Sequence, residues 1–279
     1  MRRRDFGSEG GGEGGGEGGG FLPPYELISK KPPGWHDIYA DEETDFVDVG
    51  EFPIAAWHPS YRATAIAADF LSSREWKLSC DPGQPDLGEA AIRAELKALA
   101  GSDLYGNRGN WIDEINAQKN DFSGYFACLL GCSPTSRPAT WTLVLLGIEL
   151  GALVGQYYKG KYKRARPAQL LTTLASDVAT PAHPSYPSNH SLQAHLAANC
   201  VSAAVEACRV NCDKLAARIG LLREVAGLHY PSDTAAGIHV AAKVAELLNG
   251  VEGYDALLKE ARLEWPTAVR HPNPMKAGQ

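Results

Sequence analysis

A short polar stretch in front of an apolar run decides how this chain is organised: His183-Pro-Ser-Tyr-Pro-Ser-Asn-His190-Ser-Leu-Gln-Ala-His195 (HPSYPSNHSLQAH). Prolines keep its first half out of a helix, and Ser188 is a residue type that caps helix N-termini. The backbone N–H groups of residues 189–191 would then lack intrahelical acceptors, an arrangement that favours anions. We therefore predict that a helix begins after Ser188 and delivers its N-terminus and His190 to a bound oxyanion.

The rest of the chain predicts an all-α fold. Beyond Asp86 the segments are helical in pattern, and no stretch alternates with the period of a strand. The predicted helical segments are 90–101, 111–131, 139–158, 191–210, 213–228, 233–250 and 256–265. We predict one helical bundle over residues 86–279, the part of the chain that contains all the polar groups described below. A disordered glycine- and glutamate-rich tail at 1–20 and a proline- and aromatic-rich arm at 21–85, packed on the core, precede it.

Composition matches an ordinary soluble globular protein. The 279 residues are 44% hydrophobic and 22% charged, and the net charge of −6 argues against nucleic acid or an anionic membrane surface as partner. The longest apolar run, Trp141–Val154, is too short to cross a bilayer and contains Glu149, so we expect a buried helix and no transmembrane segment. No apolar signal sequence follows the basic start, which favours a cytoplasmic location. A homo-oligomer stays open.

A basic run follows the apolar one. Five of the eight residues from Lys159 to Arg166 are Lys or Arg, in an otherwise acidic protein. The simplest interpretation is a helix end whose cations complement the helix dipole. A nucleic-acid patch is disfavoured because nothing basic elsewhere extends the run. Pro167 forces Arg166 out of helical geometry, so that Lys159 and Arg166 stand on two different local structures.

A third polar group lies near the C-terminal end, where Arg223, His229 and Asp233 are spaced six and four residues apart. A helix that starts near Pro231 places Asp233 in its first turn, and its carboxylate can accept a hydrogen bond from Nδ1 of His229. That bond would fix the tautomer and leave Nε2 as a nucleophile or ligand. Each residue alone is more often structural. Three cations, a helix N-terminus and two histidines together are what a multiply charged tetrahedral oxyanion requires.

These blocks resemble a known signature. Lys159-x6-Arg166-Pro167, Pro187-Ser188-Asn189-His190 and Arg223-x5-His229-x3-Asp233, in this order, are similar to the three-part motif of the type 2 phosphatidic acid phosphatase (PAP2) and vanadium-dependent haloperoxidase superfamily. Asn189 stands where the family usually has glycine, and Leu222 where many members have serine. Asparagine keeps the backbone N–H and tolerates left-handed geometry. We expect the pocket to persist, with a narrower mouth or an added hydrogen bond.

The resemblance implies a role for each residue. The groups that would hold the oxyanion are Lys159, Arg166, Ser188, the backbone of Asn189, and Arg223. In the phosphatase branch, His229 attacks phosphorus to form a phosphohistidine, and His190 protonates the leaving alcohol. In the haloperoxidase branch, vanadate is bound through His229 as the vanadium ligand, and hydrogen peroxide then oxidises a halide.

The fold alone does not distinguish the phosphatase branch from the haloperoxidase branch. His183 lies seven residues before His190, an offset at which similar haloperoxidases place an aromatic or histidine near the halide, although it could equally be a loop histidine. The segments 183–188 (HPSYPS) and 226–233 (AGLHYPSD) are also more similar to haloperoxidase sequences, whereas the length of the chain is closer to that of the phosphatases. The first hypothesis is a haloperoxidase with vanadate as cofactor that uses bromide or chloride. The alternative is a phosphomonoesterase that cleaves a phosphate ester without a cofactor, and a protein that merely holds an anion is the third.

Overall fold

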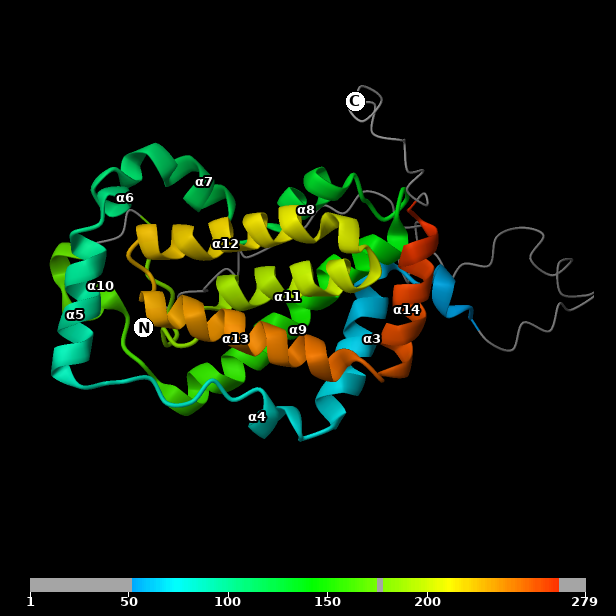
Figure 1. Ribbon diagram of the computed structural model, residues 1–279, viewed down its shortest axis with the longest axis horizontal. Helices are drawn as coiled ribbons and strands as arrows, with labels where there is room; N and C mark the ends of the chain where they lie inside the picture. The colour runs from blue at the N-terminus through cyan, green and yellow to red at the C-terminus, as the bar shows by residue number, and fades with distance from the viewer. Residues whose placement is uncertain (1–51, 175–177, 266–279) are drawn as a thin grey trace, which may run out of the picture. The chain divides into compact units, whose positions relative to one another are not determined.

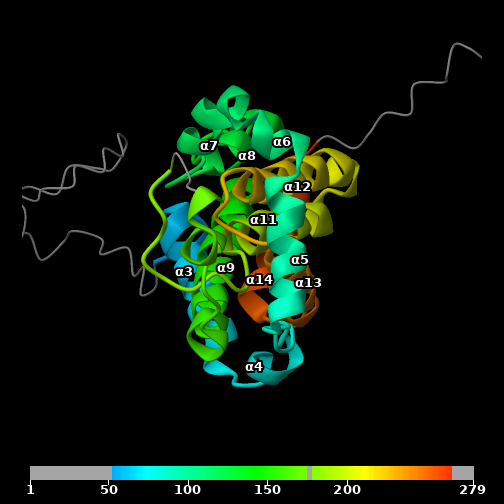
Figure 2. The same cartoon turned by 90° about the vertical axis from the view of Figure 1, so that its left-hand side faces the viewer.

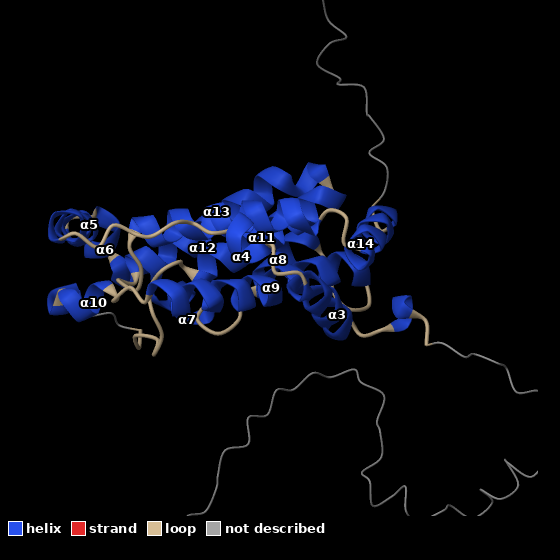
Figure 3. Cartoon of the chain, turned by 90° about the horizontal axis from the view of Figure 1, so that it is seen from below, coloured by secondary structure: helices blue, strands red, loops and turns tan. Residues whose placement is uncertain are grey.

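The computed structural model describes residues 52–174 and 178–265, and every regular element within them is a helix, which confirms the all-α prediction (Figures 1 and 3). The predicted tail at 1–20 and the arm up to residue 51 lie outside the described residues, and the domain boundaries stay predictions. The described helices are η1 (Ile54–Ala56), α3 (Pro59–Ser72), α4 (Trp76–Ser79), α5 (Glu89–Ala100), α6 (Asp103–Gly106), η2 (Arg108–Trp111), α7 (Ile112–Ala117), α8 (Ser123–Leu130), α9 (Pro138–Tyr162), α10 (Pro167–Leu170), η3 (Thr172–Leu174), α11 (Asn189–Ala204), η4 (Glu206–Cys208), α12 (Arg209–Val225), α13 (Pro231–Leu248) and α14 (Glu252–Leu263).

The core is built around α9 and α11. Helix α11 packs on α9, α12 and α13, and α9 packs in turn on α3 and α14 (Figures 1 and 2). Gly147, Gly151 and Gly155 recur every four residues on the face of α9 that meets α11. A Cβ atom at Gly147 would lie 2.4 Å from the backbone of Ala197, so only glycine allows the two helix backbones to approach this closely.

The apolar run predicted at Trp141–Val154 forms the middle of α9, and its residues Leu143, Leu146 and Leu150 are fully buried, as expected. The expectation of no transmembrane segment is disputed only weakly, on length and composition. The helical stretch within Pro138–Leu170 is long and apolar enough to cross a membrane by these two measures, since α9 continues to Tyr162, beyond the apolar run. Of its most apolar window, 61% is buried inside the protein, and a core helix of a soluble protein passes the same test.

Helices from both ends of the described chain, α3 and α14, pack on α9. Ile66 and Phe70 of α3 belong to the main core cluster, so this part of the predicted arm contains a core helix. The carboxylate of Glu264, just after α14, accepts hydrogen bonds from the backbone N–H groups of Ala139 and Thr140 at 2.7 and 2.8 Å. These N–H groups have no intrahelical acceptor, so Glu264 caps α9 from a distant part of the sequence.

Two of the predicted helices are broken. The segment 111–131 divides into α7 and α8, because the Asp121 side chain accepts a hydrogen bond from the backbone of Ser123 at 2.7 Å and starts a new helix there. The segment 191–210 ends at Ala204, where Val205 takes an extended φ of −131°, and the chain continues as η4 and α12. The first break leaves residues 118–122 as a connection between α7 and α8, and this connection reaches the functional site.

The three sequence motifs meet at one end of the bundle. The C-terminal ends of α9 and α12 and the N-terminal ends of α11 and α13 lie there, close to α5, α6 and α10, at the left of Figure 1. The backbone N–H of Ser188 donates to the carbonyl of Asp233 at 2.9 Å, which ties the starts of α11 and α13 together. The fold therefore gathers residues separated by about seventy positions of sequence at a single place.

Candidate oxyanion-binding active site

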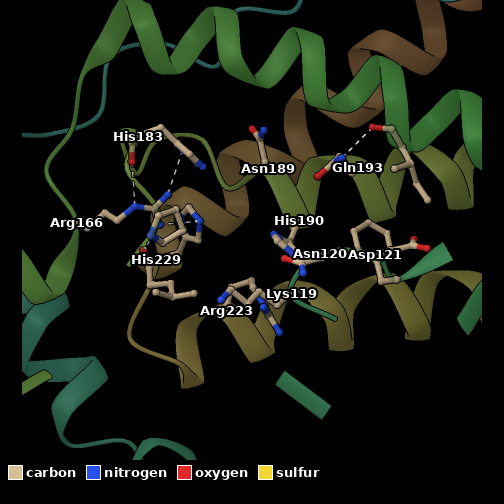
Figure 4. A pocket seen from close by; sticks show the side chains of 14 residues that line it. Lys119, Asn120, Asp121, Arg166, His183, Asn189, His190, Gln193, Arg223 and His229 are labelled. Carbon is tan, nitrogen blue, oxygen red and sulfur yellow. Dashed lines mark hydrogen bonds between the residues drawn. The ribbon is translucent and has the colours of Figure 1, made fainter. Parts of the chain in front are cut away.

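A cavity of about 210 Å³ opens at this end of the bundle (Figure 4). The predicted site residues that line it are Arg166, His183, Asn189, His190, Arg223 and His229. Lys159, Ser188 and Asp233 are buried behind this lining. The predicted residues thus form one cluster, arranged in two layers.

His229 has the orientation that its spacing from Asp233 predicts. Its Nδ1 lies 3.1 Å from Oδ2 of Asp233, and because a carboxylate only accepts, Nδ1 carries the proton. Burial lowers the pKa of His229 to about 3, so the ring is neutral at neutral pH and Nε2 bears a lone pair. Nε2 is 3.4 Å from Nη1 of Arg166. A nucleophile or ligand atom therefore stands beside a cation.

His190 occupies the first turn of α11. The Ser188 side chain accepts a hydrogen bond from the backbone of Ser191 at 3.4 Å, which confirms the predicted N-cap. Nε2 of His190 donates to the carbonyl of Gln118 at 3.0 Å, so the connection between α7 and α8 orients the ring. Burial, followed by the nearby Arg223 charge, lowers the pKa of His190 to about 4. The negative charge of a bound anion would oppose that of Arg223, stabilise the protonated ring and so raise this pKa.

Arg223 has N–H groups that are available to bind an anion. Its guanidinium is 1% exposed and lines the cavity, and Nη2 donates to the carbonyl of Ile115 at 3.0 Å. Nε and Nη1 have no hydrogen-bond partner among the described residues. Burial lowers its pKa to about 10, which still leaves it charged at neutral pH. Buried, unpaired N–H groups of a cation are costly, and an oxyanion in the cavity would supply the missing acceptors.

The guanidinium of Arg166 contacts the protein through all three of its nitrogen atoms. The residue is extended, as Pro167 predicts, with φ −79° and ψ 155°, and its Nε donates to the carbonyl of His183 at 3.0 Å. Nη1 donates to the carbonyl of Leu228 at 2.8 Å, and Nη2 lies 3.2 Å from Nδ1 of His183. Nδ1 of His183 also lies 3.2 Å from the carbonyl of Pro184, so it accepts from Arg166 in one tautomer and donates to that carbonyl in the other. His183 thus orients Arg166 at the edge of the cavity, and its predicted role beside a halide stays a prediction.

Lys159 lies behind the cavity lining. Its Nζ donates to the carbonyl oxygens of Pro184, Ser185 and Pro187 at 2.8, 2.8 and 2.6 Å, which uses all three ammonium protons. Burial and the charge of Arg166 lower the pKa of Lys159, and the charge of Asp233 opposes them. Hydrogen bonds from the ammonium to three carbonyls favour its charged form. Lys159 therefore fixes the loop that leads to Ser188, and direct contact with an oxyanion stays a prediction.

Asn189 is accommodated by a glycine on the neighbouring helix. Its side chain faces α9, where a Cβ atom on Gly155 would lie 2.1 Å from Oδ1. Oδ1 has no hydrogen-bond partner within the described residues, so the expected additional hydrogen bond does not form at this atom. The side chain also lines the cavity, as predicted for a narrower mouth. Leu222, the second departure from the motif, is buried against Ile115 and Val225.

The sequence analysis missed several lining residues. Gln193, three positions after His190 on α11, donates to the carbonyl of Ile148 at 2.9 Å and could have been found from helical spacing. Four more come from the connection between α7 and α8, which was predicted to be helical; they are Lys119, Asn120, Asp121 and Phe122. The remaining three, Ile148, Pro181 and Leu228, lie elsewhere in the chain. The sequence Asp121-Phe-Ser123 was a usable signal, because a carboxylate two residues ahead of a serine commonly starts a turn.

The site and the fold together define a class: an all-α protein with a cavity lined by buried arginine and histidine side chains. Residues 140–251 match the model of the PAP2 superfamily, which confirms over that range the resemblance of the three motifs. This match does not distinguish a soluble member from a membrane member.

Among solved structures, the chain is similar to one described as the crystal structure of the first transmembrane PAP2 type phosphatidylglycerolphosphate phosphatase from Bacillus subtilis. The identity is 15%, the TM-score is 0.44, and the match covers 69% of this chain and 94% of the other. We draw no conclusion about activity from a likeness at this level. No curated protein matches the chain.

Proposed function

We propose that this protein is a PAP2-type phosphatase that hydrolyses phosphoric monoesters through a covalent intermediate on His229. The observation that carries the proposal is that His229, with a lone pair on Nε2, and Arg223, with unpartnered N–H groups, line the same cavity. The match of residues 140–251 to the PAP2 superfamily supports it.

The first step forms a phosphohistidine. Nε2 of His229 attacks phosphorus, and the bond from phosphorus to the ester oxygen breaks. His190 gives its proton to the departing oxygen, so the leaving group departs as a neutral alcohol. In the second step water attacks phosphorus, His190 takes the water proton, and the P–N bond breaks to release inorganic phosphate and His229.

The surrounding charges favour this pathway. Arg223 and Arg166 would stabilise the charge on the non-bridging oxygens, which increases as the transition state forms. Attack by Nε2 leaves positive charge on the His229 ring. The Asp233 carboxylate, 3.1 Å away at Nδ1, stabilises that charge and keeps the ring in the reactive tautomer.

The haloperoxidase hypothesis has less support. Nothing in the described residues favours a halide in particular, and the ring of His183 is engaged with Arg166. Vanadate is a tetrahedral oxyanion like phosphate, so the unpartnered N–H groups of Arg223 and Nε2 of His229 fit it equally well. When bound, vanadate would supply peroxide-dependent halide oxidation.

One purified batch, divided in two, tests the proposal. One half, free of vanadate, is assayed on p-nitrophenyl phosphate and on phosphatidate in vesicles, which also probes action at a membrane. The other half is freed of phosphate, loaded with orthovanadate and assayed with peroxide, bromide and a chromogenic halogen acceptor. We expect phosphate release that His229→Ala abolishes and His195→Ala retains, because His195 lies outside the cavity lining and bonds to the Ser191 carbonyl. Vanadate-dependent halogenation without phosphate release would overturn the proposal.

A further inference from the structure

We infer that Glu95 and Arg164 are positioning residues, an ion-pair chain that holds Asp233 and, through it, His229. This inference rests on the proposed function, in which Asp233 orients the nucleophile. Neither residue lines the cavity. Arg164 lies within the basic run but outside the three-part motif, and Glu95 lies on α5, ahead of the range that matches the PAP2 superfamily.

Arg164 is held in one orientation by contacts on several sides. Its side chain is 2% exposed, and Nη1 lies 2.7 Å from Oδ1 of Asp233, while Nη2 lies 2.7 Å from Oε1 of Glu95. The guanidinium carbon stacks 3.8 Å from the ring centre of Tyr230. A planar, always charged fork suits a site that must hold two carboxylates at fixed angles, which a lysine could not do equally well.

These contacts determine which oxygen of Asp233 reaches the histidine. Arg164 occupies Oδ1, which leaves Oδ2 for His229. Oδ2 also accepts from the hydroxyl of Ser185 and, at 3.1 Å, from the backbone N–H of Tyr230. The carboxylate is therefore fixed against rotation. Without Arg164, Oδ1 would be a buried, unpaired acceptor and Asp233 would gain a second orientation.

Glu95 connects the chain to α13. Besides Arg164, it accepts from the backbone N–H of Ser232 at 3.0 Å and from the Ser232 hydroxyl at 2.7 Å. Glu95 thereby joins the guanidinium of Arg164 to the first turn of α13, the helix that carries Asp233.

A merely structural ion pair has different consequences from a positioning one. A structural pair contributes to the free energy of unfolding and leaves the tautomer of His229 and kcat unchanged. A positioning pair determines both, because a histidine whose partner can rotate samples the tautomer with the proton on Nε2, which cannot attack phosphorus.

The test compares Arg164→Gln, Arg164→Lys and the control Arg209→Gln, which removes an exposed arginine paired with Glu206 at 2.7 Å. We expect Arg164→Gln to lower kcat on p-nitrophenyl phosphate by about 10- to 100-fold, the range typical for residues that orient a reacting or ligating histidine, with KM within about twofold. Arg164→Lys should restore part of the loss. Long-range ¹H–¹⁵N spectra of the His229 ring should show Nδ1 protonated in the native protein and a mixture of tautomers in Arg164→Gln.

If Arg164→Gln does not fold, Glu95→Gln serves with the same measurements and a smaller expected loss of kcat. An unchanged tautomer and unchanged kcat in a folded variant would overturn the inference. The tautomer needs no catalysis to be measured. A native protein without phosphatase activity whose tautomer still changes in the variant would refute the proposed function and support the positioning chain.

Discussion

Inorganic phosphate should stabilise this protein through Arg223, and the variant Arg223→Met should lose that stabilisation. With no anion bound, two nitrogen atoms of Arg223, Nε and Nη1, are buried without a hydrogen-bond partner among the described residues. Each such group costs about 1–3 kcal/mol, and the bonds that Nη2 makes return about 1 kcal/mol each. Because the two effects oppose each other, the variant should melt within a few degrees of the native protein when no phosphate is present.

The size of the phosphate effect follows from linkage. An anion at about 100 times its dissociation constant stabilises the folded state by about 2.7 kcal/mol. For a folded domain of this size, 1 kcal/mol corresponds to a change of about 2–4 °C in the melting temperature. Phosphate should therefore raise the melting temperature of the native protein by roughly 5–10 °C.

Thermal unfolding followed by fluorescence, with phosphate titrated at constant ionic strength, measures this directly. Arg209→Met is the control, because this exposed arginine pairs with Glu206 away from the cavity and the phosphate effect should persist in it. An equal rise in the melting temperature of Arg223→Met would refute the reasoning, since the unpartnered N–H groups would then not be the anion-binding feature of the cavity.

Three further predictions concern acid–base chemistry and packing. Only protonated His190 can donate to the leaving alcohol, and the pKa of His190 is lowered to about 4. The value of kcat/KM should therefore fall about tenfold per pH unit above pH 5. The pH–rate profile of His190→Asn should lack this decline. Gly155→Ala places a Cβ atom 2.1 Å from Asn189 Oδ1 and should cost about 1–3 kcal/mol in urea unfolding. The addition of Asn189→Gly should recover most of that cost, and Gly160→Ala, which meets open space on the same helix, should cost nothing. Glu264→Gln weakens the cap of α9 and should lower the free energy of unfolding by about 1–2 kcal/mol while phosphatase activity is unchanged; a loss of activity would contradict this placement.

Features that depend on neighbouring residues could be predicted from the sequence. The N-cap at Ser188, the extended backbone at Arg166 before a proline, and the bond between His229 and Asp233 all rest on residues within four positions of one another. The helix of residues 139–158 was predicted for the same reason, although its continuation to Tyr162 was not.

Features that depend on tertiary contacts could not be predicted. The ammonium of Lys159 binds three carbonyls about 25 residues away, which no spacing rule indicates. Gly155 is needed because Asn189 lies opposite it on another helix, and Glu95 reaches Arg164 from a helix far ahead in the sequence. The contrast explains why the motif residues were found and the groups that orient them were not.

The choice between phosphatase and haloperoxidase also could not be made from the sequence. The cavity presents the same N–H groups and the same Nε2 atom to phosphate and to vanadate. Local sequence around His183 favoured the haloperoxidase, but its ring nitrogen is directed to Arg166. Phosphate ester hydrolysis is the proposal to test first, because the PAP2 match supports it.

The most direct test of the central claim is to trap the intermediate. The protein is mixed with p-nitrophenyl phosphate, quenched within milliseconds in alkali, digested, and analysed by mass spectrometry under conditions that preserve phosphohistidine. The account predicts phosphate on His229, at Nε2, and its absence from His229→Ala. Steady turnover of the ester with no phosphate on His229, or with phosphate on another residue, would contradict it.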